Sequence, residues 1–343
     1  MKVLVTGSAG FIGGYLVQEL LDRGHEVVGI DNFSKYGPVE KSYDGHERFT
    51  FVEGDAKNVA LLRDLLADCS DFVAAAAMIG GISYFHEYAY DLLAENERIV
   101  AAACDAARAV FPAGRLRKVT LISSSMVYEN ATIFPTPEGH QLVCPPPSST
   151  YGFQKLACEY FVRGLYEQYR VPYTICRPFN CVGIGERRAL GDREVPSGNL
   201  KLAMSHVVPD LVQKVVRGQD PLHILGSGAQ QRCYTYGGDL ARGIVLALTH
   251  PAGLNEDFNL STPVATTVLE LAELIWRKVH GQGPDAPPFR YVSSEPYTYD
   301  VQRRLPDVEK ARRVLGFEAT TGLSEMLDEV IPWIRQEIAA GRI

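Results

Sequence analysis

Residues 3–14 have the sequence VLVTGSAGFIGG, in which an apolar, β-branched run leads directly into a glycine-rich turn. The run predicts a buried strand, and the amphipathic segment that follows, to about Arg23, predicts a helix. Gly7 permits a sharp turn, Gly10 lets the backbone approach a pyrophosphate, and Gly13 lets the helix pack closely on the strand. The N-terminus of the helix attracts the anion. The stretch therefore predicts a dinucleotide-binding turn, with Phe11 and Ile12 beside the ligand.

A tight turn that binds nothing is the alternative explanation of these glycines. The next acidic residue argues against it, because Asp31 ends the following β-branched run at the interval expected of a dinucleotide site. A carboxylate there hydrogen-bonds a ribose 2′-hydroxyl and repels a 2′-phosphate, so NAD is favoured over NADP, although Lys35 points weakly the other way. We expect Asn32, Asp55 and Ala56 to contact the adenosine half of NAD. From the residues alone, an ordinary turn-forming role explains Asp55 equally well.

Short β-branched runs alternate with amphipathic segments through the first half of the chain. Parallel strands need long return connections, so this alternation predicts a doubly wound parallel sheet of the Rossmann type in an α/β protein. Strands are expected at 2–6, 26–30, 49–52, 71–75, 118–122 and 173–176, and helices at 58–68, 91–109 and 151–169.

Beyond Pro178 the chain becomes richer in loops, which predicts a second, smaller domain. A helix predicted at 238–248 and a strand predicted at 257–260 are expected to return to the main sheet. The predicted division is a cofactor domain at 1–178 with returning segments near 234–262, and a discontinuous substrate domain at 179–233 and 263–343.

Composition excludes several classes of protein. The 343 residues are 46% hydrophobic and 22% charged, near globular averages, and a net charge of −7 gives no basic surface for nucleic acid. Seven scattered cysteines without a CxxC pair argue against a disulfide framework or a zinc site. We find no signal peptide and no apolar run of ~20 residues. We expect a cytoplasmic enzyme without a metal, a membrane segment or a nucleic-acid partner.

A phenol and an ammonium lie four residues apart in the sequence YGFQK at 151–155. On a helix they share one face, and an ammonium stabilises a neighbouring phenolate, so Tyr151 beside Lys155 can remove a proton from a hydroxyl. Such pairs also occur on solvated helix faces. Position favours a function here, because the run LISSSMVY at 121–128 brings Ser124 to the carboxyl edge of the predicted sheet, where open α/β folds bind ligands.

Together, the glycine-rich turn, Asp31, SSSMVY at 123–128, YGFQK and RPFN at 177–180 resemble the extended short-chain dehydrogenase/reductase superfamily. More narrowly, they resemble its NAD-dependent epimerase/dehydratase family of sugar-nucleotide enzymes. The similarity extends to GSGAQQRCYTY at 226–236 and PDVEKA at 306–311, and so covers nearly the whole chain. It implies that Tyr151 is the base, that Lys155 holds the nicotinamide ribose, and that Ser124 hydrogen-bonds the sugar hydroxyl being oxidised.

The resemblance has further implications for binding and assembly. It implies that Asn180 and Arg232 contact the diphosphate of a nucleotide sugar, with a UDP-sugar favoured, and that Asn96 has a structural role. Helices near 91–109 and 151–169 would form a homodimer interface. We also expect Ala75, Ala76 and Pro178 to line the cofactor site and Val208 to line the substrate site.

Members of this family first oxidise a sugar carbon with NAD and then differ in the two side chains after the catalytic serine. By the resemblance, dehydratases carry Asp-Glu there, decarboxylases carry Glu at the second position, and 3,5-epimerases use Cys. This chain has Ser125 and Met126, neither an effective acid or base. We therefore expect C4 epimerisation of a nucleotide-bound hexose or uronic acid through a 4-keto intermediate. A 4-keto-sugar reductase or a dehydratase is the alternative enzyme, and a regulator that senses NAD is the alternative without catalysis.

Some positions depart from the family pattern. Gly80 and Gly81 stand where many relatives have a polar residue, which predicts close approach of the backbone to the substrate. His86, nearby, is expected to be exposed or satisfied in the core rather than to act as an acid. Tyr297 stands where many relatives have an arginine, so a diphosphate contact is expected to move to Arg303 or Arg304.

The loop at 183–206 is long and charged. A solvated loop is the ordinary explanation of such a segment. The sharper hypothesis is a lid in which Arg187 and Arg188 bind a carboxylate on the sugar.

Overall fold

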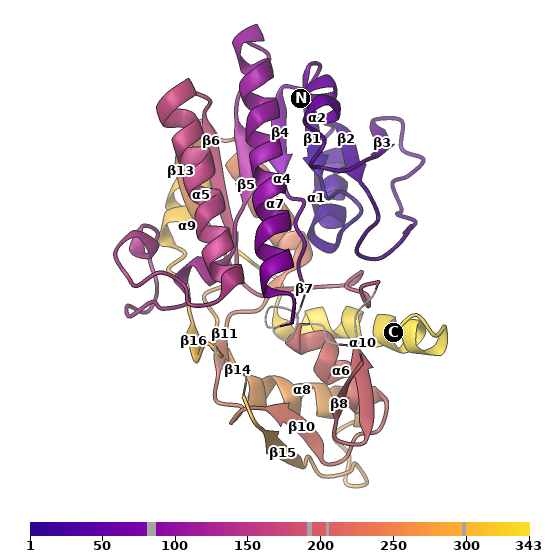
Figure 1. Cartoon of the computed structure of the whole chain (residues 1–343). Coiled ribbons are helices and arrows are strands. Elements are labelled where there is room, and N and C mark those ends of the chain that lie inside the picture. Colours follow the sequence, from indigo (N-terminus) through magenta and orange to yellow (C-terminus); the bar gives the residue numbers. More distant parts are fainter. Residues whose placement is uncertain (81–86, 191–193, 204–205, 297–299) are drawn as a thin grey trace.

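The computed structural model describes residues 1–80, 87–190, 194–203, 206–296 and 300–343. Its centre is a seven-stranded sheet in the order β3-β2-β1-β4-β5-β6-β13, in which every neighbouring pair is parallel (Figure 1). The predicted doubly wound sheet is confirmed, with strand ends one or two residues from the predicted ones where they differ. The strands are β1 (Lys2–Thr6), β2 (Glu26–Asp31), β3 (Phe49–Glu53), β4 (Asp71–Ala74), β5 (Val119–Ile122), β6 (Tyr173–Pro178) and β13 (Glu256–Leu260).

Helices cover both faces of this sheet, and β1 shows why. Val3 and Val5 belong to one core, with α1 and α7, whereas Leu4 between them belongs to another, with α2, α4 and α5. Successive side chains of a strand point to opposite faces, so a continuous apolar run needs a helical layer on each side. The helices are α1 (Phe11–Asp22), α2 (Val59–Leu66), α4 (Ala89–Val110), α5 (Thr150–Tyr169) and α7 (Gly237–Thr249).

The winding of the sheet reverses between β1 and β4. β2 and β3 lie on one side of β1, and β4, β5 and β6 follow on the other. The connections after β1 and β4 therefore diverge, and this is where open α/β sheets form a crevice for ligands.

The segment expected to return to the sheet does so. β13 pairs with β6, with Asp257 opposite Ile175, and α7 packs against α1. Later residues join the same layer, because Ala311 and Leu315 of α9 (Glu309–Leu315) and Phe317 lie in the core with α7. The predicted division into two domains stays a prediction, and the position of α9 argues for moving residues 309–317 to the sheet side.

A smaller region lies at the carboxyl edge of the sheet, in the lower part of Figure 1. Its core is formed by α6 (Val207–Val216), α8 (Val268–His280) and α10 (Leu323–Ala339), with β10 (Leu222–Leu225) paired to β15 (Tyr291–Ser294). The remaining short elements are β7 (Cys181–Val182), β8 (Glu194–Ser197), β9 (Leu200–Ala203), β11 (Gln231–Arg232), β12 (Thr235–Tyr236), β14 (Thr266–Thr267), β16 (Arg303–Arg304), η1 (Phe111–Ala113), η2 (Ser125–Tyr128), η3 (His140–Leu142) and η4 (Pro251–Gly253).

Two kinds of feature are missing from the described ranges. None of their helices is long and apolar enough to cross a membrane. Nor do these ranges hold a group of three or more His, Cys, Asp or Glu side chains that would suit a metal ion.

Candidate active site

A cleft of about 830 Å³ lies at the carboxyl ends of the strands. Its lining includes the glycine-rich turn after β1, the residues that follow β2, β4 and β5, the first turns of α5 and α6, and part of β10. Size and position are those expected of a site for a cofactor and a substrate together.

The glycines at the turn between β1 and α1 lie where a side chain would collide with backbone atoms. Gly7 has a φ of +73°, and a Cβ there would lie 2.9 Å from the Cα of Ala76; a Cβ on Gly13 would overlap the carbonyl oxygen of Gly7. Gly10 precedes α1 in an extended conformation, and no side chain in the described ranges caps the helix. The first amides of α1 are therefore left for an anionic ligand, as the pyrophosphate of a dinucleotide requires.

Asp31 lies at the end of β2 and lines the cleft. Its Oδ2 accepts a hydrogen bond from the Ala9 amide at 3.1 Å, and its Oδ1 accepts one from the Phe33 amide at 2.9 Å. Each oxygen keeps a further lone pair, so the carboxylate can also accept from a ribose hydroxyl. Asn32 and Lys35 line the same cleft, and the Lys35 Nζ lies 4.8 Å from the centroid of the Tyr36 ring.

Asp55 and Ala56 line the cleft after β3, the strand next to β2. Burial raises the pKa of Asp55, but hydrogen bonds from the backbone and side chain of Lys57 outweigh this and lower it. The carboxylate form is thus favoured. On the other side of β1, the amides of Ala75 and Ala76 each donate to the Thr6 Oγ1 at 3.1 Å, which fixes the end of β4 beside the glycine-rich turn.

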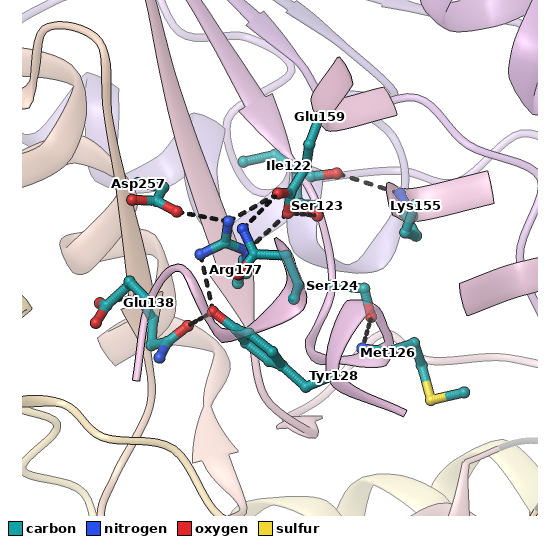
Figure 2. Close-up of polar contacts among 12 residues, drawn as sticks. Ile122, Ser123, Ser124, Met126, Tyr128, Glu138, Lys155, Glu159, Arg177 and Asp257 are labelled. Atoms are coloured by element: carbon teal, nitrogen blue, oxygen red, sulfur yellow. Dashed lines mark hydrogen bonds and ion pairs between the residues drawn. The ribbon is translucent and has the colours of Figure 1, made fainter. Parts of the chain in front are cut away.

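Ser124, Tyr151 and Lys155 meet in the lining of this cleft and are all buried. Tyr151 and Lys155 lie on the first turns of α5, which begins where the Ser149 hydroxyl accepts from the Gly152 amide at 3.0 Å. The Lys155 Nζ donates to the Ile122 carbonyl at 3.2 Å, as Figure 2 shows. Helix α5 is therefore tied to the end of β5 through the lysine itself.

The two residues after Ser124 form the wall beside Tyr151. The Ser124 Oγ accepts from the Met126 amide at 3.2 Å and so begins η2 (Figure 2). Its own proton remains to be donated. Met126 packs with Tyr151 and Leu92 in an apolar cluster, and Ser125 is buried. Neither position supplies a carboxyl group to this wall.

Two guanidinium groups face the cleft beyond this wall. Arg232 lies 3.3 Å from an oxygen of Asp300, and burial lowers its pKa. Arg304 contacts the Met126 Sδ at 2.8 Å and the Asn180 Oδ1 at 3.5 Å, and its Nε has no hydrogen-bond partner in the described ranges. Burial and the nearby positive charge of Arg232 lower the pKa of Arg304 to about 9. Both cations would be stabilised by an anionic ligand.

Some predicted site residues lie elsewhere. Arg187 and Arg188 do not line the cleft; the Arg187 Nε lies 3.2 Å from Glu337 of α10. Arg303 lies over the Phe134 ring, so of the two candidates for a diphosphate contact only Arg304 reaches the cleft. Gly80 is buried but is not part of the lining. Predictions for Gly81, His86 and Tyr297 lie outside the described residues. Pro178, Asn180 and Val208 line the cleft, and the ligand contacts predicted for them stay predictions.

Sequence reasoning missed several polar residues of the lining. Glu186 contacts the His206 ring; burial raises the pKa of Glu186, but this contact outweighs burial and lowers it. Asp210 pairs with Lys214 at 2.7 Å on α6. The four-residue spacing of Asp210 and Lys214 was a usable signal. The pairing of Glu186 with His206 was not, because it depends on how a loop folds back.

A Rossmann sheet with a Tyr/Lys pair and a serine at its carboxyl edge defines an NAD-dependent enzyme of the short-chain dehydrogenase/reductase type. The model of the NAD dependent epimerase/dehydratase family matches residues 3–261, and this chain belongs to that family.

Similar proteins are known in sequence and in structure. The UDP-glucose 4-epimerase of Mycolicibacterium smegmatis is 31% identical over 341 residues, covering 98% of this chain and 99% of that protein. The UDP-glucose 4-epimerase of Thermotoga maritima with UDP-glucose superposes with a TM-score of 0.79 at 28% identity, covering 98% and 100% of the two chains. The UDP-glucuronic acid 4-epimerase of Bacillus cereus with UDP-glucuronic acid and NAD gives 0.80 at 25% identity, covering 98% and 99%.

Proposed function

We propose that this protein interconverts the C4 epimers of a nucleotide-bound hexose or uronic acid, with UDP as the favoured nucleotide. The observation that carries the proposal is the wall around Tyr151. The proton-transfer groups Ser124, Tyr151 and Lys155 are grouped in one cleft, while Met126 and Leu92 make the adjoining surface apolar. Such a site suits removal and return of one proton and one hydride, and Ser125 and Met126 offer no carboxyl group for the elimination of water.

The mechanism follows from these groups. The Tyr151 oxygen accepts the proton of the C4 hydroxyl, while Ser124 donates a hydrogen bond to the same oxygen. NAD, when bound between the glycine-rich turn and Asp31, would supply the hydride chemistry at C4. The 4-keto sugar then rotates in the cleft, so that the opposite face of its C4 carbonyl faces the nicotinamide site. Tyr151 returns the proton to the C4 oxygen when the hydride is added to that face. Substrate and product have the same mass.

The alternative reactions need features that are not found in this wall. A dehydratase of the family would carry carboxyl groups at positions 125 and 126, where this chain has serine and methionine. A terminal reductase would use a 2′-phosphorylated cofactor as a rule, and the Asp31 carboxylate opposes that phosphate.

Incubation with UDP-hexoses and UDP-uronic acids, followed by mass spectrometry, tests the proposed reaction. We expect an isomer of unchanged mass. Loss of about 18 mass units would mean dehydration and loss of about 44 decarboxylation, since these are the masses of water and carbon dioxide that a 4-keto sugar can lose. Either result, or no isomer from any of these sugars, contradicts the proposal.

A uronic acid substrate is favoured by Arg304. This guanidinium touches Met126, which packs on Tyr151, so it lies close to the group that must face C4. We infer that Arg304 binds a carboxylate on the neighbouring C5 and that Arg232 binds the diphosphate. The earlier hypothesis assigned the carboxylate to Arg187 and Arg188, but the pairing of Arg187 with Glu337 argues against it.

Two further proposals concern assembly and location. We infer a homodimer formed through α4 and α5, because α5 exposes the aromatic side chains of Phe153, Tyr160 and Phe161. Monomeric proteins seldom leave such an apolar stripe uncovered. We infer a cytoplasmic location from the cysteines, all seven of which are free thiols.

A further inference from the structure

A buried charged cluster lies directly behind the catalytic residues. It consists of Ser123, Glu159, Arg177 and Asp257, which we call the Glu159 cluster (Figure 2). Arg177 is 0% exposed and Glu159 1%. Glu159 accepts two hydrogen bonds of 2.7 Å from Arg177, one to each carboxylate oxygen, and Arg177 also donates to Asp257 at 2.6 Å. Burial alone would lower the pKa of Arg177, but the neighbouring carboxylates of Glu159 and Asp257 hold it well above its usual value.

Stability alone is a weak reason for this cluster. Removing two charges from water is costly, and apolar residues of similar volume often stabilise a core equally well. The residues that the cluster holds in place give a better explanation of it.

Glu159 holds the end of β5. Its Oε1 accepts a hydrogen bond from the Ser123 Oγ at 2.7 Å. Ser123 stands between Ile122, whose carbonyl accepts from the Lys155 Nζ, and Ser124. One short segment, residues 122–124, thus carries both the partner of the catalytic lysine and the catalytic serine.

Two side chains of helix α5 are hydrogen-bonded to this segment. Tyr151, Lys155 and Glu159 recur at four-residue intervals and so share one face of the helix. Lys155 bonds the Ile122 carbonyl, and Glu159 bonds the next side chain, that of Ser123. Arg177 on β6 holds the Glu159 carboxylate through two hydrogen bonds, which connect α5 and residues 122–124 to the neighbouring strand.

We propose that Glu159 is a positioning residue that acts through Ser123. It holds residues 122–124 against α5 and thereby sets the Lys155 ammonium and the Ser124 hydroxyl relative to the Tyr151 phenol. The proposal rests on the proposed function for the identity of the catalytic groups. Loss of the hydrogen bond between Ser123 and Glu159 would leave the fold intact but displace Lys155 and Ser124 relative to Tyr151.

Ser123→Ala tests this without changing any charge, because the bond between Glu159 and Arg177 stays. We expect kcat to fall on the order of 10- to 100-fold with little change in KM, as small displacements of catalytic groups do. Amide hydrogen exchange of residues 122–128 in the holoenzyme should also become faster, because this segment loses one of its two bonds to α5.

Thr174→Val is the matched control. Thr174 is a buried hydroxyl on the neighbouring strand β6, bonded to the Gly253 carbonyl and the Lys118 Nζ, and neither of these residues lines the cleft. We expect it to lower the melting temperature without changing kcat or the hydrogen exchange of residues 122–128. If Ser123→Ala behaves like this control, Glu159 is merely structural and the proposal is wrong. The exchange measurement needs no substrate, so a wild-type enzyme that turns over no UDP-sugar would contradict only the proposed function.

Discussion

At the scale of single residues, the environment of Tyr151 determines what the site can do. The side chain is 4% exposed and packs against Leu92 and Met126. In this apolar wall, the Lys155 ammonium and the Ser124 hydroxyl are the polar groups that the proposed mechanism uses. Tyr151 therefore has to carry the proton in both directions.

Tyr151→Phe should abolish most turnover while the fold persists. The substitution removes the phenolic oxygen, the proton acceptor, and leaves the ring in its apolar contacts. A loss of roughly 10²- to 10⁴-fold in kcat is the usual cost of deleting a general base. The measurement is epimer formation by the purified variant, with bound NAD and melting temperature as controls. A variant of near wild-type rate would mean that another group takes the proton.

In the proposed function, Arg304 recognises the charge of the sugar. Arg304→Gln should weaken a UDP-uronic acid by about 1.5–3 kcal/mol, the range for a hydrogen bond to a charged group, and a neutral UDP-hexose much less. Affinities of the two substrates for the holoenzyme give the comparison. Arg187→Ala is the control, because its partner is Glu337 of α10, and it should affect both substrates alike. Equal losses in Arg304→Gln would place this arginine at the diphosphate instead.

At the scale of elements, the local sequence pattern was sufficient to predict the sheet but not the residues that form the walls of the cleft. The strand at 2–6, the glycine-rich turn and the helix after it are encoded in contiguous residues, and so is the spacing of Tyr151 and Lys155. The position of Arg304 depends on residues more than 120 apart in the chain, because it contacts Asn180 and Met126. The ion pair of Arg187 with Glu337 likewise joins a loop to α10, near the chain end. No periodicity reports such contacts.

Asp257 links four elements and should make stability depend on pH. It lies on β13 and pairs with Arg177 of β6 at 2.6 Å, with Lys310 of α9 at 2.9 Å and with Arg163 of α5 at 3.4 Å. Burial raises the pKa of Asp257, but Arg177 and Lys310 outweigh burial and hold it well below the usual range. A depressed pKa in the folded state stabilises the fold above the unfolded value of ~3.9. This stabilisation is lost as the pH falls towards the folded-state pKa.

Asp257→Asn should consequently lower the free energy of unfolding at pH 7 by about 2–3 kcal/mol and flatten its decline between roughly pH 5 and pH 3. Urea unfolding at several pH values measures both effects. Asp285→Asn, which removes an exposed carboxylate from a loop, is the control and should leave the pH profile unchanged. If Asp257→Asn keeps the wild-type slope, other carboxylates dominate acid unfolding.

At the scale of the whole molecule, the outer face of the helical layer formed by α4 and α5 exposes aromatic side chains that no other element covers in the described ranges. Helices α4 and α5 pack against each other over the sheet (Figure 1). The outward side of α5 carries Phe153, Tyr160 and Phe161, which are 48%, 59% and 38% exposed. At Gly164, one turn further along, no described residue outside the adjoining helix backbone lies within 4 Å of where a Cβ would be. The spacing of these positions puts them on one stripe of the helix, flat enough for a second helix to approach.

We therefore expect Tyr160→Glu to convert a dimer into a monomer, because it places a charge in the middle of this apolar stripe, where burial against a second copy would be costly. Sedimentation velocity of the holoenzyme at micromolar concentration measures the change in mass. Tyr291→Glu is the matched control: Tyr291 is 42% exposed on β15, in the smaller region, and its substitution should leave the dimer intact. A wild-type protein that sediments as a monomer, or a Tyr160→Glu variant that remains a dimer, would remove this face from the interface.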